Sequence, residues 1–381
     1  MLVFFSCAGS PPSKKIPTPA PVPGPEIPAA PRADYLTIVA VGDNLPHDPI
    51  IRAGFVNGVY KFDSMYDKIR GYIIPADIAF VNQETVLVDK DLGYTGYPLF
   101  GSPKETGTAL AAAGFDIVNH ATNHIMDKGE AGVLSSMDFW DSHEGIHYLG
   151  IHRSEEDRAN RRIIISKNNF KVGFLSYTYG TNGISLPAGK PWLVSLADQT
   201  VMAAEIKALR PLCDYLVVSM HWGEEYRLDY SPEQEKLAVF LADQQVDLVI
   251  GHHPHVLEPL VIMKRSDGKS MPVFYSLGNF LSAHAMPEKE ALYGGLMYVK
   301  LKKVDNEISV EKIGLIPVIS HYNANMSGFS IYPLHEYTEE LAAKHWKRRG
   351  DTEMTSAYFL KKSREMFGPA LILENPFAGE K

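Results

Sequence analysis

Short apolar runs recur along the chain, and each ends at a glycine or a polar residue. Residues 35–41 form a continuous β-branched run that stops at Gly42 and Asp43, which is the pattern of a strand buried on both faces. Four further runs of this kind cover residues 77–81, 115–118, 215–220 and 246–250. Helical stretches separate them, at residues 104–113, 128–143, 198–209 and 232–244. This alternation predicts an α/β fold with a mostly parallel inner sheet.

Two other segments have the pattern of antiparallel hairpins. Their strands are predicted at residues 162–165, 172–177, 295–303 and 308–316. The first pair flanks Asn168 and Asn169, and the second flanks Asp305 and Asn306, which are residue types that favour tight hairpin turns. These hairpins predict a second sheet packed on the first. The polar residues 321–381 contain two helical stretches, at 339–348 and 357–367, and predict a helical C-terminal tail.

The composition of the N-terminal residues differs from that of the rest of the chain. Residues 11–31 hold nine prolines, a composition that stays extended and does not pack. Before them, Cys7 follows a short apolar stretch and a small residue, which resembles the bacterial lipobox, where a cysteine is lipidated. We therefore expect a lipoprotein signal remnant over residues 1–10, a proline-rich stalk over residues 11–33, and an extracytoplasmic protein anchored to the cell membrane. The alternative is an ordinary disordered N-terminus.

Charge and cysteine content exclude several classes of protein. The net charge is −8 with both signs interspersed, so the chain lacks the dense basic patch that binding to nucleic acid requires. Two cysteines are too few for a disulfide scaffold or a cysteine-based zinc site. Cys213 precedes an apolar run and is expected to be a small buried hydrophobic residue. No run of about 18 apolar residues occurs, so we expect no membrane-spanning helix.

Potential metal ligands follow nearly every predicted strand. They stand in five segments, at Asp43, residues 82–84, residues 119–127, His221 and residues 251–255. In open α/β sheets ligands bind beyond the carboxyl ends of the strands, so we expect these side chains along one edge of one sheet. Carboxylate and amide oxygens combined with imidazole nitrogens suit Mn²⁺, Fe or Zn²⁺ better than Ca²⁺ or copper. Two ions could share this set.

Hydrolysis at such a site also needs a group that protonates the leaving group. His124 is the candidate general acid, held by a hydrogen bond to Asp127 one turn later. The alternative is a structural cluster in which Asn123 caps a helix and Asp127 stabilises the helix dipole.

Six motifs in a fixed order carry a family resemblance. They are Gly42-Asp43 and residues 82–85, 121–129, 221–226, 251–256 and 275–280. Together they resemble the bacterial capsule-synthesis proteins of CapA type, a family associated with poly-γ-glutamate capsules. That family in turn resembles the calcineurin-like metallophosphoesterases. The resemblance implies a metallophosphoesterase-like αββα sandwich over residues 34–320, followed by a C-terminal helical extension over residues 321–381.

The same resemblance implies a ligand set and a cofactor. The implied metal ligands are Asp43, Glu84, Asn123, His221, His253 and His255. His124 is implied as general acid, and one or two divalent ions, Mn²⁺ or Zn²⁺, as cofactor. The chain departs from the superfamily in two ways. Its Asp-x-His motif is absent, because Asn44 and Leu45 follow Asp43, so a histidine ligand is missing unless His47 replaces it. Glu84 also stands where the superfamily has a bridging aspartate.

Further residues are candidates for substrate binding or for support of the ligands. The substrate-binding candidates are Arg52, Glu225, Tyr226 and Arg227, of which the arginines could bind carboxylate or phosphate groups bidentately. Solvent-facing loop charges are the alternative for these four. Asn82 and Asn279 are expected to support the metal ligands. Residues 93–101 are rich in aromatic side chains and are either a lid over the site or a surface loop.

Three classes of function follow from these observations. The first is a metal-dependent hydrolase on the outer face of the membrane, acting on a phosphoester or on an anionic cell-surface polymer such as poly-γ-glutamate. The second is a non-catalytic component of a capsule assembly and export apparatus, which binds the polymer or the synthase and export proteins. The intact His124 and Asp127 pair favours the first, and the missing histidine favours the second. A solute-binding lipoprotein would not explain the histidines at the strand ends.

Overall fold

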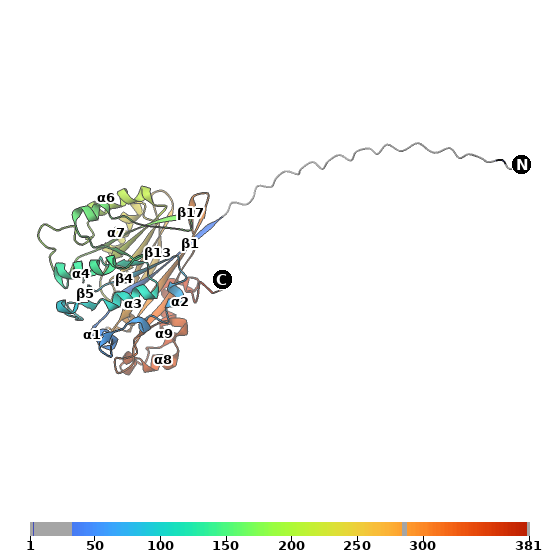
Figure 1. Cartoon of the computed structure of the whole chain (residues 1–381). Helices are drawn as coiled ribbons and strands as arrows, with labels where there is room; N and C mark the ends of the chain where they lie inside the picture. Colours follow the sequence, from blue (N-terminus) through green and yellow to red (C-terminus); the bar gives the residue numbers. More distant parts are fainter. Residues whose placement is uncertain (1–2, 4–32, 284–287, 379–381) are drawn as a thin grey trace. The chain divides into compact units, whose positions relative to one another are not determined.

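Two β-sheets form the centre of the fold (Figure 1). The computed structural model describes residue 3, residues 33–283 and residues 288–378. Contacts divide the chain into two units, Met1–Arg32 and Ala33–Lys381, and the second contains both sheets. Cys7 and the proline-rich residues 11–31 lie outside the described residues. Among the described residues, every helix is too short or too polar to span a bilayer.

The first sheet is mixed. Its strands, in spatial order, are β18 (Ser330–Pro333), β17 (Glu307–His321), β16 (Tyr293–Val304), β1 (Asp34–Leu45), β4 (Ile78–Gln83), β7 (Ile117–Asn119) and β8 (His147–Leu149), with β15 (Asn279–Ser282) beside β1. Strands β1, β4, β7 and β8 run parallel, whereas β16, β17 and β18 are antiparallel to their neighbours. The carboxyl ends of the parallel strands therefore meet at one edge of this sheet.

The second sheet has a parallel centre. Its strands, in spatial order, are β13 (Leu257–Lys264), β14 (Ser270–Leu277), β12 (Leu248–His252), β11 (Tyr215–His221), β10 (Phe170–Thr178) and β9 (Ile163–Lys167). Strands β10, β11, β12 and β14 are parallel, and β9 and β13 close the two edges in antiparallel pairing. The remaining short strands are β2 (Phe55–Val56), β3 (Val59–Tyr60), β5 (Leu87–Val88) and β6 (Ser102–Pro103).

Nine α-helices lie among the described residues. They are α1 (Asp48–Gly54), α2 (Arg70–Ile73), α3 (Glu105–Ala113), α4 (Gly129–Asp141), α5 (Glu155–Asn160), α6 (Gln199–Leu209), α7 (Pro232–Asp243), α8 (Glu339–Lys344) and α9 (Ser356–Phe367). All four helices predicted between the strands are present. Ser231 begins α7 with a capping box, because its side chain accepts from the backbone of Gln234 and the Gln234 side chain accepts from the backbone of Ser231.

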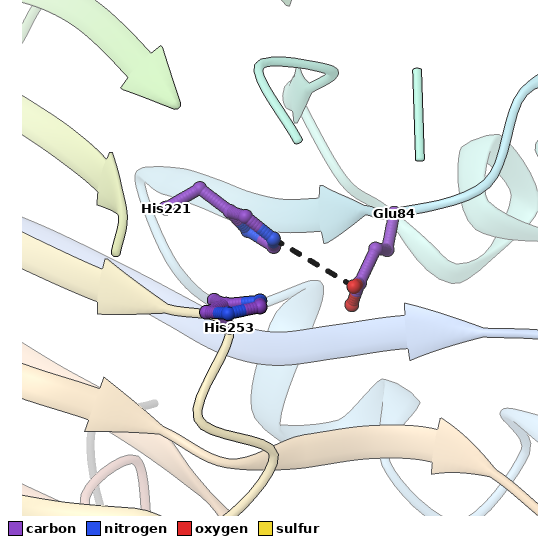
Figure 2. A group of neighbouring side chains, drawn as sticks. All are labelled: Glu84, His221 and His253. Carbon is purple, nitrogen blue, oxygen red and sulfur yellow. Dashed lines mark ion pairs between the residues drawn. The ribbon is translucent and has the colours of Figure 1, made fainter. Parts of the chain in front are cut away.

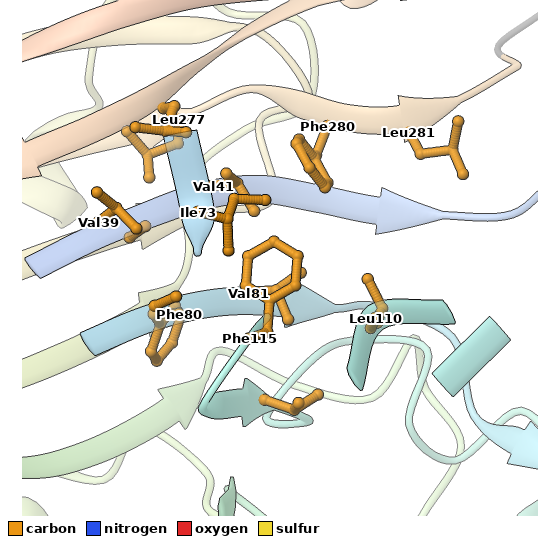
Figure 3. Close-up of a cluster of buried hydrophobic side chains, with 14 of the residues drawn as sticks. Val39, Val41, Ile73, Phe80, Val81, Leu110, Phe115, Leu277, Phe280 and Leu281 are labelled. Atoms are coloured by element: carbon orange, nitrogen blue, oxygen red, sulfur yellow. The ribbon is translucent and has the colours of Figure 1, made fainter. Parts of the chain in front are cut away.

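Alternate residues of the inner strands pack on opposite sides. Val218 of β11 joins a cluster with Ile206 of α6 and Leu241 of α7, whereas the adjacent Val217 joins the cluster that contains the first sheet. Figure 3 shows part of the latter cluster, in which Leu110 of α3 lies with side chains of β1 and β4. Each fully buried aliphatic side chain contributes roughly 1.5–3 kcal/mol. The αββα sandwich is therefore confirmed, and its inner strands β4, β11 and β12 are buried along their whole length because both of their faces are covered.

The assignment of strands to sheets differs from the sequence prediction. The strands predicted at residues 215–220 and 246–250 belong to the second sheet, so the expectation that all ligand-bearing strands share one sheet is wrong. The hairpin of β9 and β10 lies in the second sheet, and that of β16 and β17 lies in the first. The hairpin turns form as predicted, with positive φ at Asn168, Asn169, Asp305 and Asn306. Apolar patterning indicates that a strand is buried on both faces, but it does not indicate which strand lies beside it.

The C-terminal segment contains a strand as well as helices. Strand β17 extends to His321, across the predicted boundary at residue 320, and β18 pairs with it. Helices α8 and α9 then follow, and Phe359 of α9 is buried against Tyr293 of β16 with ring centroids 4.9 Å apart. A strand of four residues without clear turn signals on both sides is easily missed from sequence.

A buried carboxyl group in β13 leads to a prediction about stability. Glu258 is fully buried, and Gln234 Nε2 donates to its Oε2 at 2.7 Å. Burial raises the pKa of Glu258 to about 8, and the hydrogen bond from Gln234 offsets only part of that rise. The folded chain therefore holds a proton that the unfolded chain releases, so stability is lost as pH rises from about 5 to 8.

Glu258→Gln should remove this loss, because the amide keeps an acceptor for Gln234 and does not ionise. Denaturant unfolding in EDTA at pH 5 and pH 8 measures the effect. Between these pH values the free energy of unfolding should fall further in the wild type than in the variant, by on the order of 2 kcal/mol. The exposed Glu235→Gln variant is the control and should behave as wild type. If the free energy of unfolding fell equally in Glu258→Gln and in the wild type, the raised pKa would not belong to Glu258.

Candidate metal centre

The carboxyl ends of strands from both sheets meet at one cluster of ligands. Asp43 stands in β1 and Glu84 follows β4 of the first sheet, whereas His221 ends β11 and both His253 and His255 follow β12 of the second. Ligand atoms of Glu84, His221 and His253 lie within 4.8 Å of one another, and so do those of Asp43, Glu84 and His255. Figure 2 shows the first group, whose side chains point toward one another. The two sheets therefore build the centre jointly.

Glu84 belongs to both groups. Its side chain is fully buried, and neither carboxylate oxygen has a hydrogen-bond partner among the described residues. Its Oε1 lies 3.6 Å from His221 Nε2 and 3.7 Å from His255 Nε2. Burial raises the pKa of Glu84 well above its usual value. Since a buried carboxylate without donors is costly, this position is suited to bridging cations.

One side of the cluster is rich in neutral imidazole. Burial lowers the pKa of His221 well below its usual value and that of His253 to about 3, so both rings are in the neutral form that binds metal. His221 Nε2 donates to Asn123 Oδ1 at 2.9 Å. The amide nitrogen of Asn123 is turned away and donates to Asn182 at 3.2 Å. The oxygen of Asn123 is thus directed into the site, as a metal ligand requires.

The other side of the cluster is centred on Asp43. Asn82 Nδ2 donates to Asp43 Oδ1 at 2.8 Å, and His255 Nδ1 donates to Asp43 Oδ2 at 3.0 Å. Burial would raise the pKa of Asp43, but His252 and His255 outweigh burial and hold the pKa well below its usual value. Burial likewise lowers the pKa of His255, yet Glu84 and Asp43 raise it to about 9. Asp43 and Glu84 therefore favour a cation at this position, which in the ion-free chain is the proton of His255.

Asn82 and Asn279, the two asparagines expected to support the metal ligands, each form hydrogen bonds to a candidate ligand. Asn82 holds Asp43, and its own oxygen accepts from Asn119 at 2.7 Å. Asn279 Oδ1 lies 3.2 Å from His255 Nδ1, and its nitrogen donates to the backbone oxygen of His255 at 3.2 Å. Both asparagines thus hold the side chain or backbone of a candidate ligand in place.

The turn after β12 has an unusual backbone. His253 has φ of 97° and His255 has φ of 59°, values that side-chain-bearing residues adopt rarely and that often mark functional sites. A Cβ on Gly251 would lie 1.9 Å from the backbone oxygen of Tyr275, so only glycine allows this approach of strands. His252 stacks on Phe80 at 5.9 Å and is in none of the ligand groups, consistent with the expectation that it is a spare histidine.

His124 and Asp127 form the predicted pair. Their Nδ1 and Oδ2 atoms are 2.7 Å apart, and Asp127 Oδ2 also accepts from the backbone N–H of Phe100 at 2.7 Å. The following helix α4 begins at Gly129 with Lys128 as its N-cap. The alternative that Asn123 caps this helix is therefore wrong. His124 is nearly buried and lies on the wall of a cleft.

The cleft beside the ligands has a volume of about 410 Å³. It is lined by Leu45, His47, Asp48, Pro49, Tyr97, Phe100, His124, Glu225, Tyr226, His255, Ala283 and Met326. Among the described residues, this wall contains no lysine or arginine. Glu225 and Tyr226 line it as the substrate prediction requires, and Tyr97 and Phe100 place residues 93–101 on the same wall.

The two predicted arginines lie away from this cleft. Arg52 is exposed on α1 and is not among the lining residues, and Arg227 pairs with Glu224 at 3.2 Å on the surface. The cleft therefore does not provide the expected arginine contacts to an anionic substrate. A charge pattern in a loop indicates neither the direction of a side chain nor the surface it faces.

His47 does not replace the missing histidine ligand. Its Nδ1 lies 2.9 Å from the backbone oxygen of Leu45 and 3.3 Å from the backbone nitrogen of Ala283, and the residue is in none of the three ligand groups. The third of these groups contains Glu225, whose carboxylate lies with His253 and His255. From the sequence, Glu225 was expected to bind substrate, and its proximity to the two histidines was not foreseen.

Two residues after β10 also contact the site and were not foreseen. The ring of Tyr179 lies 4.7 Å from that of His253, and Asn182 accepts from Asn123. The sequence feature that could have indicated these two residues is the polar segment that follows β10. Because the β9 and β10 hairpin was expected outside the ligand-bearing sheet, its end was not considered.

Two of the solved structures with similar folds are described as a phosphatase and a phosphoesterase. A phosphatase of Mycoplasma pneumoniae aligns with 15% identity and a TM-score of 0.46, covering 76% of this chain and 95% of that protein. A calcineurin-like phosphoesterase of Bacillus subtilis aligns with 14% identity and a TM-score of 0.41, covering 87% of this chain and 100% of that protein.

Sequence comparison finds closer relatives. A capsule biosynthesis protein CapA of Bacillus anthracis is 32% identical over 259 residues, which cover 65% of this chain and 60% of the relative. A PGA biosynthesis protein CapA of Bacillus subtilis strain 168 is 31% identical over 180 residues, 47% of this chain and 45% of the relative. The chain thus spans 60% or less of these two relatives. Residues 37–284, more than half of the chain, match the family described as bacterial capsule synthesis protein PGA_cap. The chain therefore belongs to this family of bacterial capsule synthesis proteins.

Proposed function

We propose that this protein is a metal-dependent hydrolase that acts in the biosynthesis of a capsule or another cell-surface polymer. The observation that carries the proposal is Glu84, a fully buried carboxylate without hydrogen-bond donors that lies between two groups of metal-ligating side chains. The names of the relatives support a role in capsule biosynthesis, and the set of oxygen and nitrogen donors supports metal-dependent hydrolysis. The substrate we propose is a phosphoester or an anionic polymer of the poly-γ-glutamate class.

The residues present fit one or two divalent ions. Glu84, Asn123, His221 and His253 would hold one ion, and Asp43, Glu84 and His255 would hold the other. This mixture of oxygen and nitrogen donors suits Mn²⁺ or Zn²⁺. When bound, such ions would stabilise the charge that develops on a phosphoryl or carbonyl oxygen during hydrolysis.

His124 is proposed to protonate the leaving group. Its Nδ1 is engaged by Asp127, which fixes the ring and leaves Nε2 as the nitrogen that serves the substrate. Asp127 is itself held by the backbone N–H of Phe100, so the pair is anchored to the wall of the cleft. Loss of His124 would therefore affect the chemical step more than the binding of metal.

The wall of the cleft favours a substrate with one reacting anionic group. Tyr97, Phe100 and Tyr226 offer aromatic surface, whereas Asp48 and Glu225 are the acidic residues of the wall. A segment with many free carboxylates would face these two acids without a compensating cation from the lining residues. A phosphoester, or one bond of a polymer presented at the metals, fits this arrangement better.

Metal binding is tested first with Glu84→Gln in the full chain. In the wild type stripped with EDTA, adding Mn²⁺ or Zn²⁺ should raise the free energy of unfolding, by about 2.7 kcal/mol at 100 times Kd. Glu84→Gln should be more stable than wild type without metal, because it removes a buried carboxylate without donors, and it should lose the metal-induced gain. Thermal unfolding measures both effects.

Glu235→Gln on the exposed face of α7 is the control for this experiment and should keep the full gain. A wild-type chain that gains no stability and retains no metal by mass spectrometry would defeat the hydrolase proposal. The non-catalytic role in polymer binding or export would then be the better account.

His124→Ala should lower kcat on a substrate found by screening phosphoesters and γ-glutamyl polymers by about 10² to 10⁴-fold. Metal content should stay at the wild-type value, since His124 is in none of the ligand groups. His335→Ala, an exposed histidine far along the chain, is the control and should keep full activity. Full activity of His124→Ala would exclude its role as general acid.

Attachment to the membrane by a lipid on Cys7 is also proposed, with the domain on the outer face. Cys7→Ala should move the full chain from the membrane fraction of its host to the soluble fraction, as measured by fractionation and immunoblotting. Cys213→Ala is the control, because Cys213 is buried in the folded unit as predicted and should not affect attachment. Retention of Cys7→Ala in the membrane fraction would contradict lipidation at this residue.

A further inference from the structure

The two sides of the candidate centre are unequally supplied with ligands. The His221 side has Glu84, Asn123, His221 and His253, whereas the Asp43 side has only Asp43, Glu84 and His255. On the latter side both oxygens of Asp43 already accept hydrogen bonds. The position at which the Asp-x-His motif of the superfamily carries its histidine is filled by Leu45, which is buried and lines the cleft. That side therefore lacks one donor from β1.

Glu225 lies beside one histidine from each side of the centre. A carboxylate oxygen of Glu225 and ligand nitrogens of His253 and His255 lie within 4.8 Å of one another. The side chain is exposed and lines the cleft, so it approaches from the open side of the centre. Asp43 and Glu84 approach from the buried side.

The backbone of the loop that carries Glu225 is held next to the turn after β12. The loop after β11 turns at Gly223, with φ of 90°, and at Tyr226, with φ of 64°. The backbone N–H of Tyr226 donates to the oxygen of Pro254 at 2.8 Å. Pro254 stands between His253 and His255, so this hydrogen bond ties the loop directly to the turn that carries both histidines.

The adjacent glutamate behaves differently. Glu224 is exposed and pairs with Arg227 at 3.2 Å, and it does not line the cleft. Two neighbouring residues of the same type thus have different surroundings. Glu224 has a cationic partner on the surface, whereas Glu225 faces the imidazoles of the centre.

We propose that Glu225 is a metal ligand that completes the ion site on the Asp43 side, in place of the histidine that this chain lacks. The inference rests on the proposed metal centre and deepens it. With Glu225, this site holds three carboxylates and one imidazole, and the other holds one carboxylate, one amide oxygen and two imidazoles. Oxygen-rich sites suit Mn²⁺, and imidazole suits Zn²⁺, so the two sites should differ in metal preference.

The test compares full-length wild type with Glu225→Gln and Glu224→Gln. Each protein is stripped with EDTA, loaded with one equivalent of Zn²⁺ and titrated with Mn²⁺. Free Mn²⁺ is followed by electron paramagnetic resonance, and bound metals are counted by mass spectrometry. Wild type and Glu224→Gln should bind one Mn²⁺ beside the Zn²⁺. Glu225→Gln should keep the Zn²⁺ and bind Mn²⁺ at least about tenfold more weakly, as expected for loss of a ligand or its close partner.

Three outcomes would overturn the inference in distinguishable ways. Unchanged Mn²⁺ binding by Glu225→Gln, with two metals in wild type, would remove the role of Glu225 and leave the metal centre standing. A wild type that binds one ion, unaffected by Glu225→Gln, would also remove it and leave a one-metal centre. A wild type that binds no metal would defeat the inference together with the proposed function. Thermal unfolding of the stripped proteins checks that the loop substitution leaves the fold intact.

Discussion

The buried carboxylate of Glu84 is the interaction around which the site is organised. It is held between two sheets at the point where their parallel strands end, and no described residue donates a hydrogen bond to it. Burying such a group without compensation costs several kcal/mol. Histidines from the second sheet surround Glu84, and Glu84 and Asp43 together raise the pKa of His255. A cation at this position would therefore be bound by side chains from both sheets.

Close approach of the two sheets depends on glycines and on a strained turn. A Cβ on Gly42 would lie 1.9 Å from the backbone oxygen of Gly278, and the same distance would separate a Cβ on Gly251 from Tyr275. Gly42 thus lets β1 approach the residue between β14 of the second sheet and β15 of the first, and Gly251 lets β12 approach its neighbour β14. The positive φ values of His253 and His255 then direct both rings toward Glu84 and Asp43. Backbone strain is thus concentrated at the residues that a metal would hold, where bound ions would offset it.

Much of this arrangement was predictable from sequence, for a physical reason. Strands buried on both faces are continuously apolar, so their ends are visible as the first polar residues, and Asp43, His221 and His253 were found in this way. The pairing of strands is a long-range property, and for that reason the sequence placed β11 and β12 in the wrong sheet. The contribution of Glu225 depends on a loop anchored by the hydrogen bond between Tyr226 and Pro254, which leaves no periodic signal. Arg52 and Arg227 were expected in the cleft and do not line it, because the sequence does not indicate the direction of their side chains.

Electrostatics sets how such a centre can select its substrate. Because the described wall of the cleft carries acidic and aromatic side chains but no lysine or arginine, attraction for an anionic group has to come from the centre itself. Each carboxylate ligand would lower the positive charge that bound ions present to the cleft, and Glu225 would do so from the side on which a substrate would enter. An oxygen-rich, asymmetric centre would therefore retain enough charge to polarise one group without binding a polyanion along its length. In the proposed hydrolase, selectivity would then arise from the ligand set, and the aromatic residues of the cleft would position what lies beside the reacting bond.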